Sequence, residues 1–130
     1  MVVDTSAVVA FLRNEPEAER VQEKLAQASC HMSALTVFEC RTVLLRRFGV
    51  AMLAEFDQLI QWAGIAIVPF DEGQAEAAFD AYRRFGKGSG HRAQLNLVDC
   101  AAYALAKTLN LPLLFKGDDF AHTDVASALA

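Results

Sequence analysis

The sequence predicts an α/β fold in which a central, mostly parallel sheet of four or five strands is covered by helices on both faces. Short apolar runs alternate with longer segments of helical spacing along all 130 residues. The segments between strand candidates are too long for hairpins, so neighbouring strands are expected to run parallel. No repeat, linker or low-complexity stretch interrupts the chain, which indicates a single domain over residues 1–130.

Two strands and four helices are expected in the first half of the chain. The strands are Val2-Val3 and Cys30-His31-Met32, and the helices cover residues 5–13, 16–29, 35–48 and 51–63. The helical segments repeat their apolar residues at intervals of three and four, which is typical of amphipathic helices. Pro16 suits the first turn of the second helix, and Gly49 is a typical stop signal after the third.

The second half continues the alternation. Its strands are Ile65-Ala66-Ile67-Val68 and Leu111-Pro112-Leu113-Leu114-Phe115, and its helices cover residues 71–85 and 96–106, with a short one in the tail. The glycine-rich loop 86–91 does not follow a strand with P-loop spacing, so it is not expected to cradle a nucleotide. In folds of this order, ligands bind at the carboxyl ends of the strands.

The composition of the chain indicates in which cellular compartment the protein is expected. The chain is 54% hydrophobic, yet no apolar stretch approaches the roughly 20 residues that span a bilayer. The apolar excess indicates burial on two sides or a buried oligomer face. Asp4 would interrupt a signal peptide, and three cysteines without C-x-x-C spacing favour reduced thiols, so we expect a cytoplasmic protein. The cysteines are Cys30, Cys40 and Cys100.

Carboxylates stand at four junctions between predicted elements. Asp4 and the pair Asp118 and Asp119 follow strands, whereas Glu39 and Asp99 lie near the starts of helices. All of these junctions are expected at one edge of the sheet. Carboxylates that gather there raise one another's pKa unless a cation compensates. A hard divalent cation such as Mg²⁺ or Mn²⁺ takes oxygen ligands, and this metal chemistry serves hydrolysis of phosphodiesters.

Each acid also has a purely structural explanation. Asp4 suits a helix N-cap, Glu39 stands at capping-box spacing from Thr36, and Asp99 can favour the positive end of its helix. Asp118 and Asp119 could be turn residues. Asp71 also follows a strand and opens a helix, so position alone does not exclude it from the set.

The chain resembles a PIN-domain ribonuclease of the VapC type, the toxin of a type II toxin–antitoxin pair. The resemblance covers nearly the whole chain and rests on four blocks in order. These are Val2-Val3-Asp4-Thr5-Ser6-Ala7, then Ser33-Ala34 with Glu39-Cys40, then the loop 86–91 with Leu95 to Ala106, then Leu113 to Phe120 with Thr123-Asp124. It implies a PIN-like three-layer α/β/α fold and metal-dependent cleavage of single-stranded RNA.

The resemblance also implies roles for the acids. Asp4 and Asp99 are expected to hold the main Mg²⁺ (or Mn²⁺) ion, which lowers the pKa of a bound water. Glu39 and the fourth acid are expected to bond its waters or help to hold a second ion. Related toxins often read Gly-Asn-Asp-Phe where this chain has Asp118-Asp119, which favours Asp119 as the fourth acid and leaves Asp118 as an additional charge at the metal site. Asp71 has no counterpart in the family.

Two hydroxyl side chains and one basic segment complete the expected site. Thr5 and Ser33 are expected to orient ligands or waters by hydrogen bonds, with helix capping as the alternative. The net charge of −4 argues against a broad nucleic-acid surface. One segment is locally basic and could steer the RNA backbone, or could equally be a solvated helix end. It contains Arg83, Arg84, Lys87, His91 and Arg92.

The family resemblance implies partners as well. VapC toxins are inhibited by a small VapB-type antitoxin, whose tail lies along a groove and can present an arginine to the acids. The apolar residues of helices 5–13 and 35–60 also suit a homodimer, and no membrane partner is expected. Rival interpretations are a PIN-like module that only binds and, with less support, a receiver domain or a dehalogenase-like phosphatase. A receiver domain has paired acids after the first strand, whereas this chain has only Asp4 there. A phosphatase of this kind has Asp-x-Asp, but residue 6 is Ser.

Overall fold

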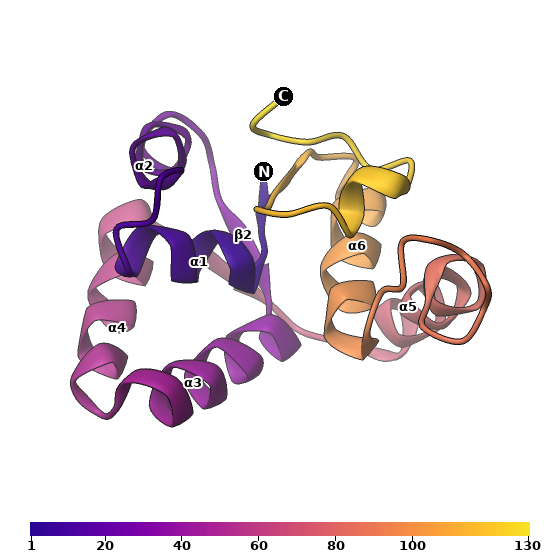
Figure 1. The fold of residues 1–130 in the computed structure, drawn as a ribbon, viewed down its shortest axis with the longest axis horizontal. Helices are drawn as coiled ribbons and strands as arrows, with labels where there is room; N and C mark the ends of the chain where they lie inside the picture. The colour runs from indigo at the N-terminus through magenta and orange to yellow at the C-terminus, as the bar shows by residue number, and fades with distance from the viewer.

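A computed structural model describes all of residues 1–130 and has the predicted alternation of strands and helices (Figure 1). Its elements are β1 (Val2–Val3), α1 (Thr5–Leu12), α2 (Ala18–Gln27), β2 (His31–Ser33), α3 (Ala34–Phe48), α4 (Ala51–Ala63), β3 (Ala66–Val68), α5 (Glu72–Phe85), α6 (Leu97–Leu109), β4 (Leu113–Leu114) and a 3₁₀ turn, η1 (Phe120–His122). None of its helices combines the length and apolar character that crossing a membrane requires.

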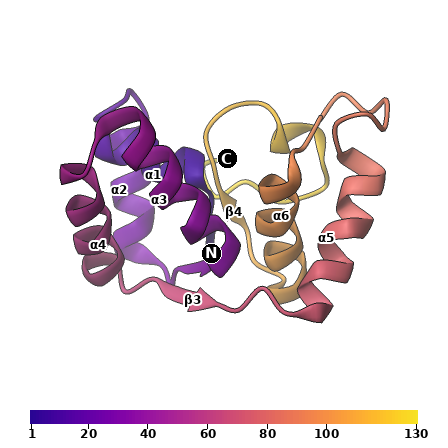
Figure 2. The same ribbon diagram turned by 90° about the horizontal axis from the view of Figure 1, so that it is seen from below.

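The four strands form one parallel sheet in the order β3-β2-β1-β4. Adjacent residues of a strand point to opposite faces. Val3 therefore packs into a core with α1 to α4, whereas Val2 packs into a second core with α5 and α6. Figure 1 shows these two helical layers on either side of the strands, and Figure 2 shows α5 beside α6. The predicted three-layer α/β/α fold is confirmed, and of the four or five strands expected in the sheet the structure has four.

Local signals explain several element boundaries. Gly49 ends α3 with a φ of 94°, and Gly64 ends α4 in the left-handed region with a φ of 62°. Both conformations are easiest for glycine, because a side chain would be strained there. Asp71 caps α5, since its Oδ1 accepts a 2.9 Å hydrogen bond from the backbone N–H of Gln74.

The tail differs from the predicted short helix. Only Phe120–His122 form a 3₁₀ turn, and the segment beyond it returns along the sheet. Ser127 makes a parallel bridge with Leu113, and the backbone N–H of Leu113 donates to the carbonyl of Ala126 at 2.8 Å. The prediction was wrong because the alanines of the tail favour a helix locally, whereas the exposed backbone of β4 offers a hydrogen-bonding edge that they fill.

Candidate metal-dependent nuclease site

Asp4 lies immediately after β1 and is both a helix cap and a buried carboxylate. Its Oδ2 accepts hydrogen bonds from the backbone N–H and the hydroxyl of Ser6, at 3.0 and 2.6 Å. Its Oδ1 is buried and has no hydrogen-bond partner. Burial raises the pKa of Asp4, and the nearby Glu39 carboxylate adds to the rise. An unpaired buried oxygen is costly, so this atom calls for a cationic or hydrogen-bonding partner.

Glu39 is held by a hydroxyl group from a different helix. Thr5, the first residue of α1, donates a 2.5 Å hydrogen bond to Glu39 Oε1. Cys40 in turn donates to the Thr5 hydroxyl, with 3.4 Å between Sγ and Oγ1. The alternative of a capping box with Thr36 is not realised, because Ser33 is the N-cap of α3 and its Oγ accepts from the backbone N–H of Leu35 at 3.2 Å. The Glu39 carboxylate is therefore not engaged in capping α3.

Asp99 occupies the first turn of α6. It forms a capping box with Asn96: the backbone N–H of Asp99 donates to Asn96 Oδ1 at 2.8 Å, and that of Asn96 donates to Asp99 Oδ2 at 3.0 Å. Burial raises the pKa of Asp99 from 3.8 to about 7, against the lowering effect of the Asn96 N–H. The carboxylates of Asp4, Glu39 and Asp119 raise it further. These acids therefore act on one another electrostatically.

One cavity of about 350 Å³ joins three of the predicted acids. Asp4, Glu39 and Asp99 come from three different elements and line it together. Polar groups dominate the remaining wall. The other lining residues are Thr5, Ser6, Val9, Glu15, Val43, Arg47, Asn96 and Lys116. We call this cavity the acidic pocket.

Comparison with known proteins places this geometry in a family. The PIN domain model matches residues 1–126. The chain belongs to the PIN domain family. A ribonuclease VapC of Mycolicibacterium smegmatis is 48% identical over 128 residues, which cover 98% of each chain. The receiver-domain and phosphatase interpretations find no support in these matches.

Two solved structures share the fold. Mycobacterium tuberculosis VapC20, described as a sarcin–ricin loop cleaving toxin, superposes with a TM-score of 0.72 at 16% identity, covering 98% of this chain and 97% of the other. A toxin–antitoxin complex from Klebsiella pneumoniae has a TM-score of 0.72 at 17% identity, covering 99% and 97%. At such low identity these structures show the fold alone.

The two candidates for the fourth acid, Asp118 and Asp119, do not line the acidic pocket. Both Asp118 and Asp119 are exposed, in the loop that follows β4. Only Asp119 is among the charges that raise the pKa of Asp99. This effect on the pKa of Asp99 favours Asp119 over Asp118 as the fourth acid.

The residues of the acidic pocket fit a hydrated divalent cation rather than a fully enclosed one. No group of three carboxylate, histidine or cysteine side chains is close enough to hold a metal ion by itself. Mg²⁺ usually keeps several waters and contacts only one or two carboxylates, so separated acids around a polar cavity are compatible with it. The unpaired Oδ1 of Asp4 is the atom that most needs such a partner.

Two cations of the acidic pocket were missed by the sequence analysis. Lys116 follows β4, and its backbone N–H donates to the hydroxyl of Ser6 at 3.0 Å. Its ammonium group pairs with Glu15 at 2.6 Å and with Glu17 at 3.4 Å. Arg47, near the end of α3, lines the same cavity. Lys116 could have been found by its place after a strand, but nothing in the local sequence marks Arg47.

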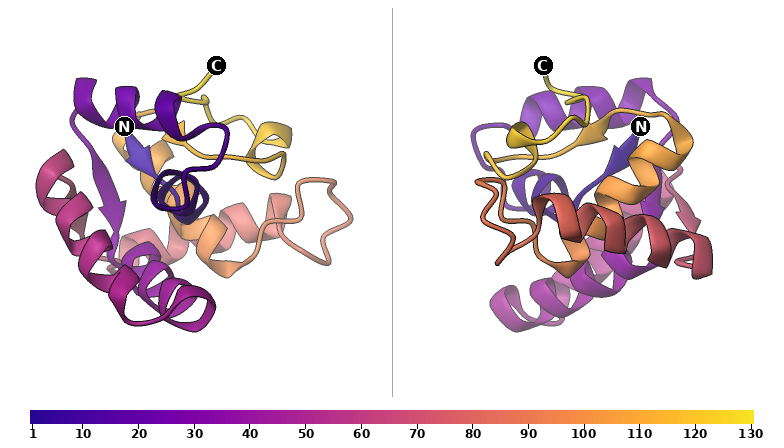
Figure 3. Two further views of the ribbon diagram at one scale, coloured as in Figure 1. Left: turned by 60° about the vertical axis from the view of Figure 1, so that its left-hand side comes forward. Right: turned by 90° about the vertical axis from the view of Figure 1, so that its right-hand side faces the viewer.

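The basic segment between Arg83 and Arg92 does not line the acidic pocket. Arg83 pairs with Asp80 at 2.7 Å, and Arg84 lies 3.7 Å from Asp80 and 3.9 Å from Asp124. The loop between α5 and α6 projects beside α5 in both views of Figure 3. The charges of both arginines are thus partly compensated within the protein, and an RNA-steering role for this segment stays a prediction.

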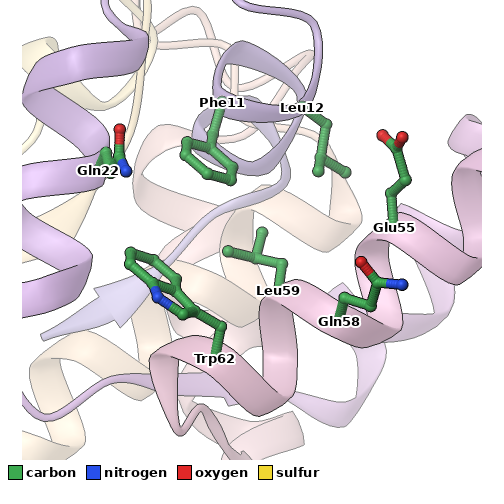
Figure 4. A pocket seen from close by; sticks show the side chains of 7 residues that line it. All are labelled: Phe11, Leu12, Gln22, Glu55, Gln58, Leu59 and Trp62. Atoms are coloured by element: carbon green, nitrogen blue, oxygen red, sulfur yellow. The ribbon is translucent and has the colours of Figure 1, made fainter.

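A second cavity of about 430 Å³ lies between α1, α2 and α4 (Figure 4). Phe11 and Leu12 of α1 face Leu59 and Trp62 of α4, and the Phe11 and Trp62 rings are parallel with 6.1 Å between centroids. Trp62 remains 53% exposed. The rest of the lining is polar: Gln22, Glu55 and Gln58. This groove contains no cluster of acids and suits apolar side chains of a partner.

Proposed function

We propose that this PIN domain is a metal-dependent endoribonuclease that cleaves single-stranded RNA in the acidic pocket and acts as the toxin of a toxin–antitoxin pair. The observation that carries the proposal is the cavity shared by Asp4, Glu39 and Asp99, with a buried and unpaired oxygen on Asp4. The 48% identity to a ribonuclease VapC over the same length supports RNA as the substrate.

We assign each acid a role in metal binding from its position. Asp4 and Asp99 would hold Mg²⁺ or Mn²⁺, and Glu39 and Asp119 would bind its water shell. When bound, the cation supplies neutralisation of phosphate charge and makes water more acidic. Thr5 keeps the Glu39 carboxylate in place through its hydrogen bond. The hydrogen bond of Ser33 to the start of α3 supports a capping role for this residue rather than contact with the metal ligands.

Cleavage of a labelled single-stranded RNA tests the proposal directly. We expect fragments when the purified protein is incubated with Mg²⁺ or Mn²⁺, and none when the cations are removed with a chelator. Adding the cation back should restore cleavage. RNA that binds but stays intact in every condition would favour the alternative of a PIN-like binding module.

A VapB-type antitoxin is the partner we propose for the groove of Figure 4. The Klebsiella pneumoniae neighbour is described as a toxin–antitoxin complex. Helix α1 lines both cavities, with Thr5 at the acidic pocket and Phe11 at the groove. A segment anchored on Trp62 can thus extend along α1 toward the acids. Expression of the toxin should arrest growth, the antitoxin should relieve the arrest, and Trp62→Ala should weaken this relief without preventing the arrest.

We also propose a homodimer through the outer face of α3, α5 and α6. Three large apolar side chains, Phe38, Phe79 and Leu97, are 65%, 68% and 70% exposed. Phe79 and Leu97 line a hydrophobic cavity of about 270 Å³. It is lined by Leu35, Phe70, Ala75, Ala78, Phe79, Tyr82, Leu97 and Cys100. Clustered exposed apolar groups of this size commonly mark protein interfaces. The apolar residues 7–10 of α1, by contrast, are buried in the core and do not contribute.

Phe79→Glu is expected to convert the dimer to a monomer, because a carboxylate placed in the buried interface would lack a partner. Light scattering after gel filtration measures the mass. Val50→Glu is the matched control, since Val50 is 72% exposed but does not line the hydrophobic cavity. A dimer that survives Phe79→Glu, or a wild-type protein that is monomeric, would contradict the proposed interface.

A further inference from the structure

The acidic pocket is bordered by an arrangement of two arginines and one aromatic ring. The Arg47 guanidinium lies over the Phe48 ring, 5.1 Å from its centroid, and the Arg13 guanidinium lies over the same ring at 4.3 Å. Both distances are within the roughly 6 Å range of cation–π contacts. Arg13 follows the last turn of α1, whereas Arg47 is in the last turn of α3. The chain thus brings together two helix ends that are distant in sequence.

These two arginines lack an acidic partner, as do half of the other ten lysines and arginines of the chain. Arg41, Arg83, Arg84, Lys107 and Lys116 each form an ion pair with an aspartate or a glutamate. Arg13 and Arg47 form none, and both are exposed. Their charge is therefore available to a ligand, in a protein whose net charge is −4.

The helix dipole explains only part of this arrangement. Cations favour the C-terminal turn of a helix, which accounts for Arg46 and Arg47 equally. Arg46 makes no cation–π contact and does not line the acidic pocket, whereas Arg47 makes such a contact and lines the pocket. Two guanidinium groups against one ring also repel each other weakly, and an anion beside them would offset this repulsion. The position of Arg47 therefore indicates an anionic ligand that enters or leaves the acidic pocket.

We infer that Arg47, Phe48 and Arg13 form a binding subsite for the nucleotides that flank the cleaved bond of a single-stranded RNA. The inference rests on the proposed nuclease function and specifies where the substrate lies. Arginine suits phosphate because its planar guanidinium can donate two parallel hydrogen bonds. Guanidinium planes and aromatic rings also stack on unpaired bases. The strand runs from the acidic pocket past Arg47 to Arg13, since only Arg47 lines the pocket and both contact Phe48.

Steady-state cleavage of a labelled RNA by single variants tests the subsite. We expect Arg47→Ala and Arg13→Ala each to raise KM about tenfold while kcat changes less than about threefold, and to lower the slope of log KM against log salt by about one. Arg46→Ala, the adjacent residue at the same helix end, should leave KM within about twofold of wild type and the slope unchanged. Arg47→Lys keeps the positive charge but loses the planar guanidinium group, so its KM should lie between that of the wild type and that of Arg47→Ala.

The outcomes separate the subsite from the nuclease function. Absence of cleavage by the wild-type protein with Mg²⁺ and Mn²⁺ would refute the function itself. If the wild type cleaves RNA but Arg46→Ala and Arg47→Ala have the same KM, the subsite is overturned. The effect of both arginines on KM would then come from general positive charge and not from a specific contact. An unchanged RNA KM together with weaker inhibition by the antitoxin would assign the two arginines to the protein partner and likewise overturn it. An alanine variant could unfold at a lower temperature than the wild type, and Arg47→Lys then replaces it. RNA affinity is measured for Asp99→Asn, which does not cleave, and for the Asp99→Asn, Arg47→Lys double variant. Equal affinity of these two proteins for RNA would count against the subsite.

Discussion

Replacing Asp99 with Asn is expected to lower the rate of RNA cleavage by more than about 100-fold. Changes to residues that merely orient a metal ligand typically cost about 10–100-fold, so loss of a ligand carboxylate should cost more. The fold should remain, because Asn can accept the same hydrogen bond from Asn96 through its amide oxygen. Initial rates at saturating Mg²⁺ measure the effect, and circular dichroism checks the fold.

Asp71→Asn is the matched control for this experiment. Asp71 also follows a strand and opens a helix, and it caps α5 through Gln74, but it does not line the acidic pocket. Its replacement removes the same charge from an equivalent local position and should leave the rate within about twofold, as expected of an exposed site away from the chemistry. Full activity of Asp99→Asn, or an equal loss in both variants, would refute the metal-site assignment.

The same assay ranks the two candidates for the fourth acid. Asp119 acts electrostatically on Asp99, whereas Asp118 is not among the charges that do so. We therefore expect Asp119→Asn to reduce the rate about tenfold or more, as for a group that holds the water shell of a metal ion. Asp118→Asn should have a smaller effect, and the reverse order would show that Asp118 is the family acid.

The meeting of Asp4, Glu39 and Asp99 could be predicted because it follows from topology. In a parallel sheet every strand ends at the same edge, and each following helix starts there. Asp4 caps α1 through Oδ2, and its Oδ1, which is buried without a partner, stays available for the predicted metal site. A carboxylate has two oxygens, so the two interpretations did not exclude each other.

Contacts between side chains from distant segments could not be predicted. The hydrogen bond from Thr5 to Glu39 joins residues 34 positions apart, and the arrangement of Arg13 with Arg47 around Phe48 depends on how α1 crosses α3. Periodicity shows which face of a helix is apolar but not which neighbouring side chains it meets. Arg47 therefore looked like an ordinary cation at the end of a helix.

The raised pKa of Asp99 predicts that the metal-free protein loses stability as pH rises. Its carboxyl has a pKa of about 7 in the folded protein against an ordinary value of 3.8, so between these values the folded state binds more protons than the unfolded state. The free energy of unfolding therefore falls as pH increases through this window and levels off above it. One pKa unit corresponds to about 1.4 kcal/mol, and since Asp99 is partly exposed we expect a loss of about 1–3 kcal/mol.

Urea unfolding of the wild type and Asp99→Asn in the presence of a chelator isolates this contribution. The two proteins should be about equally stable near pH 4, and the variant should be the more stable by about 1–3 kcal/mol at pH 8, because it has no charge to desolvate. Mg²⁺ at about 1,000 times its Kd should reverse the order at pH 8, since a ligand at that concentration stabilises the state that binds it by about 4.1 kcal/mol. A wild type that is as stable as Asp99→Asn at pH 8 without metal would contradict the raised pKa that burial and the neighbouring carboxylates give Asp99. A wild type that gains stability from neither Mg²⁺ nor Mn²⁺, although the pH dependence is as expected, would contradict the proposed metal site.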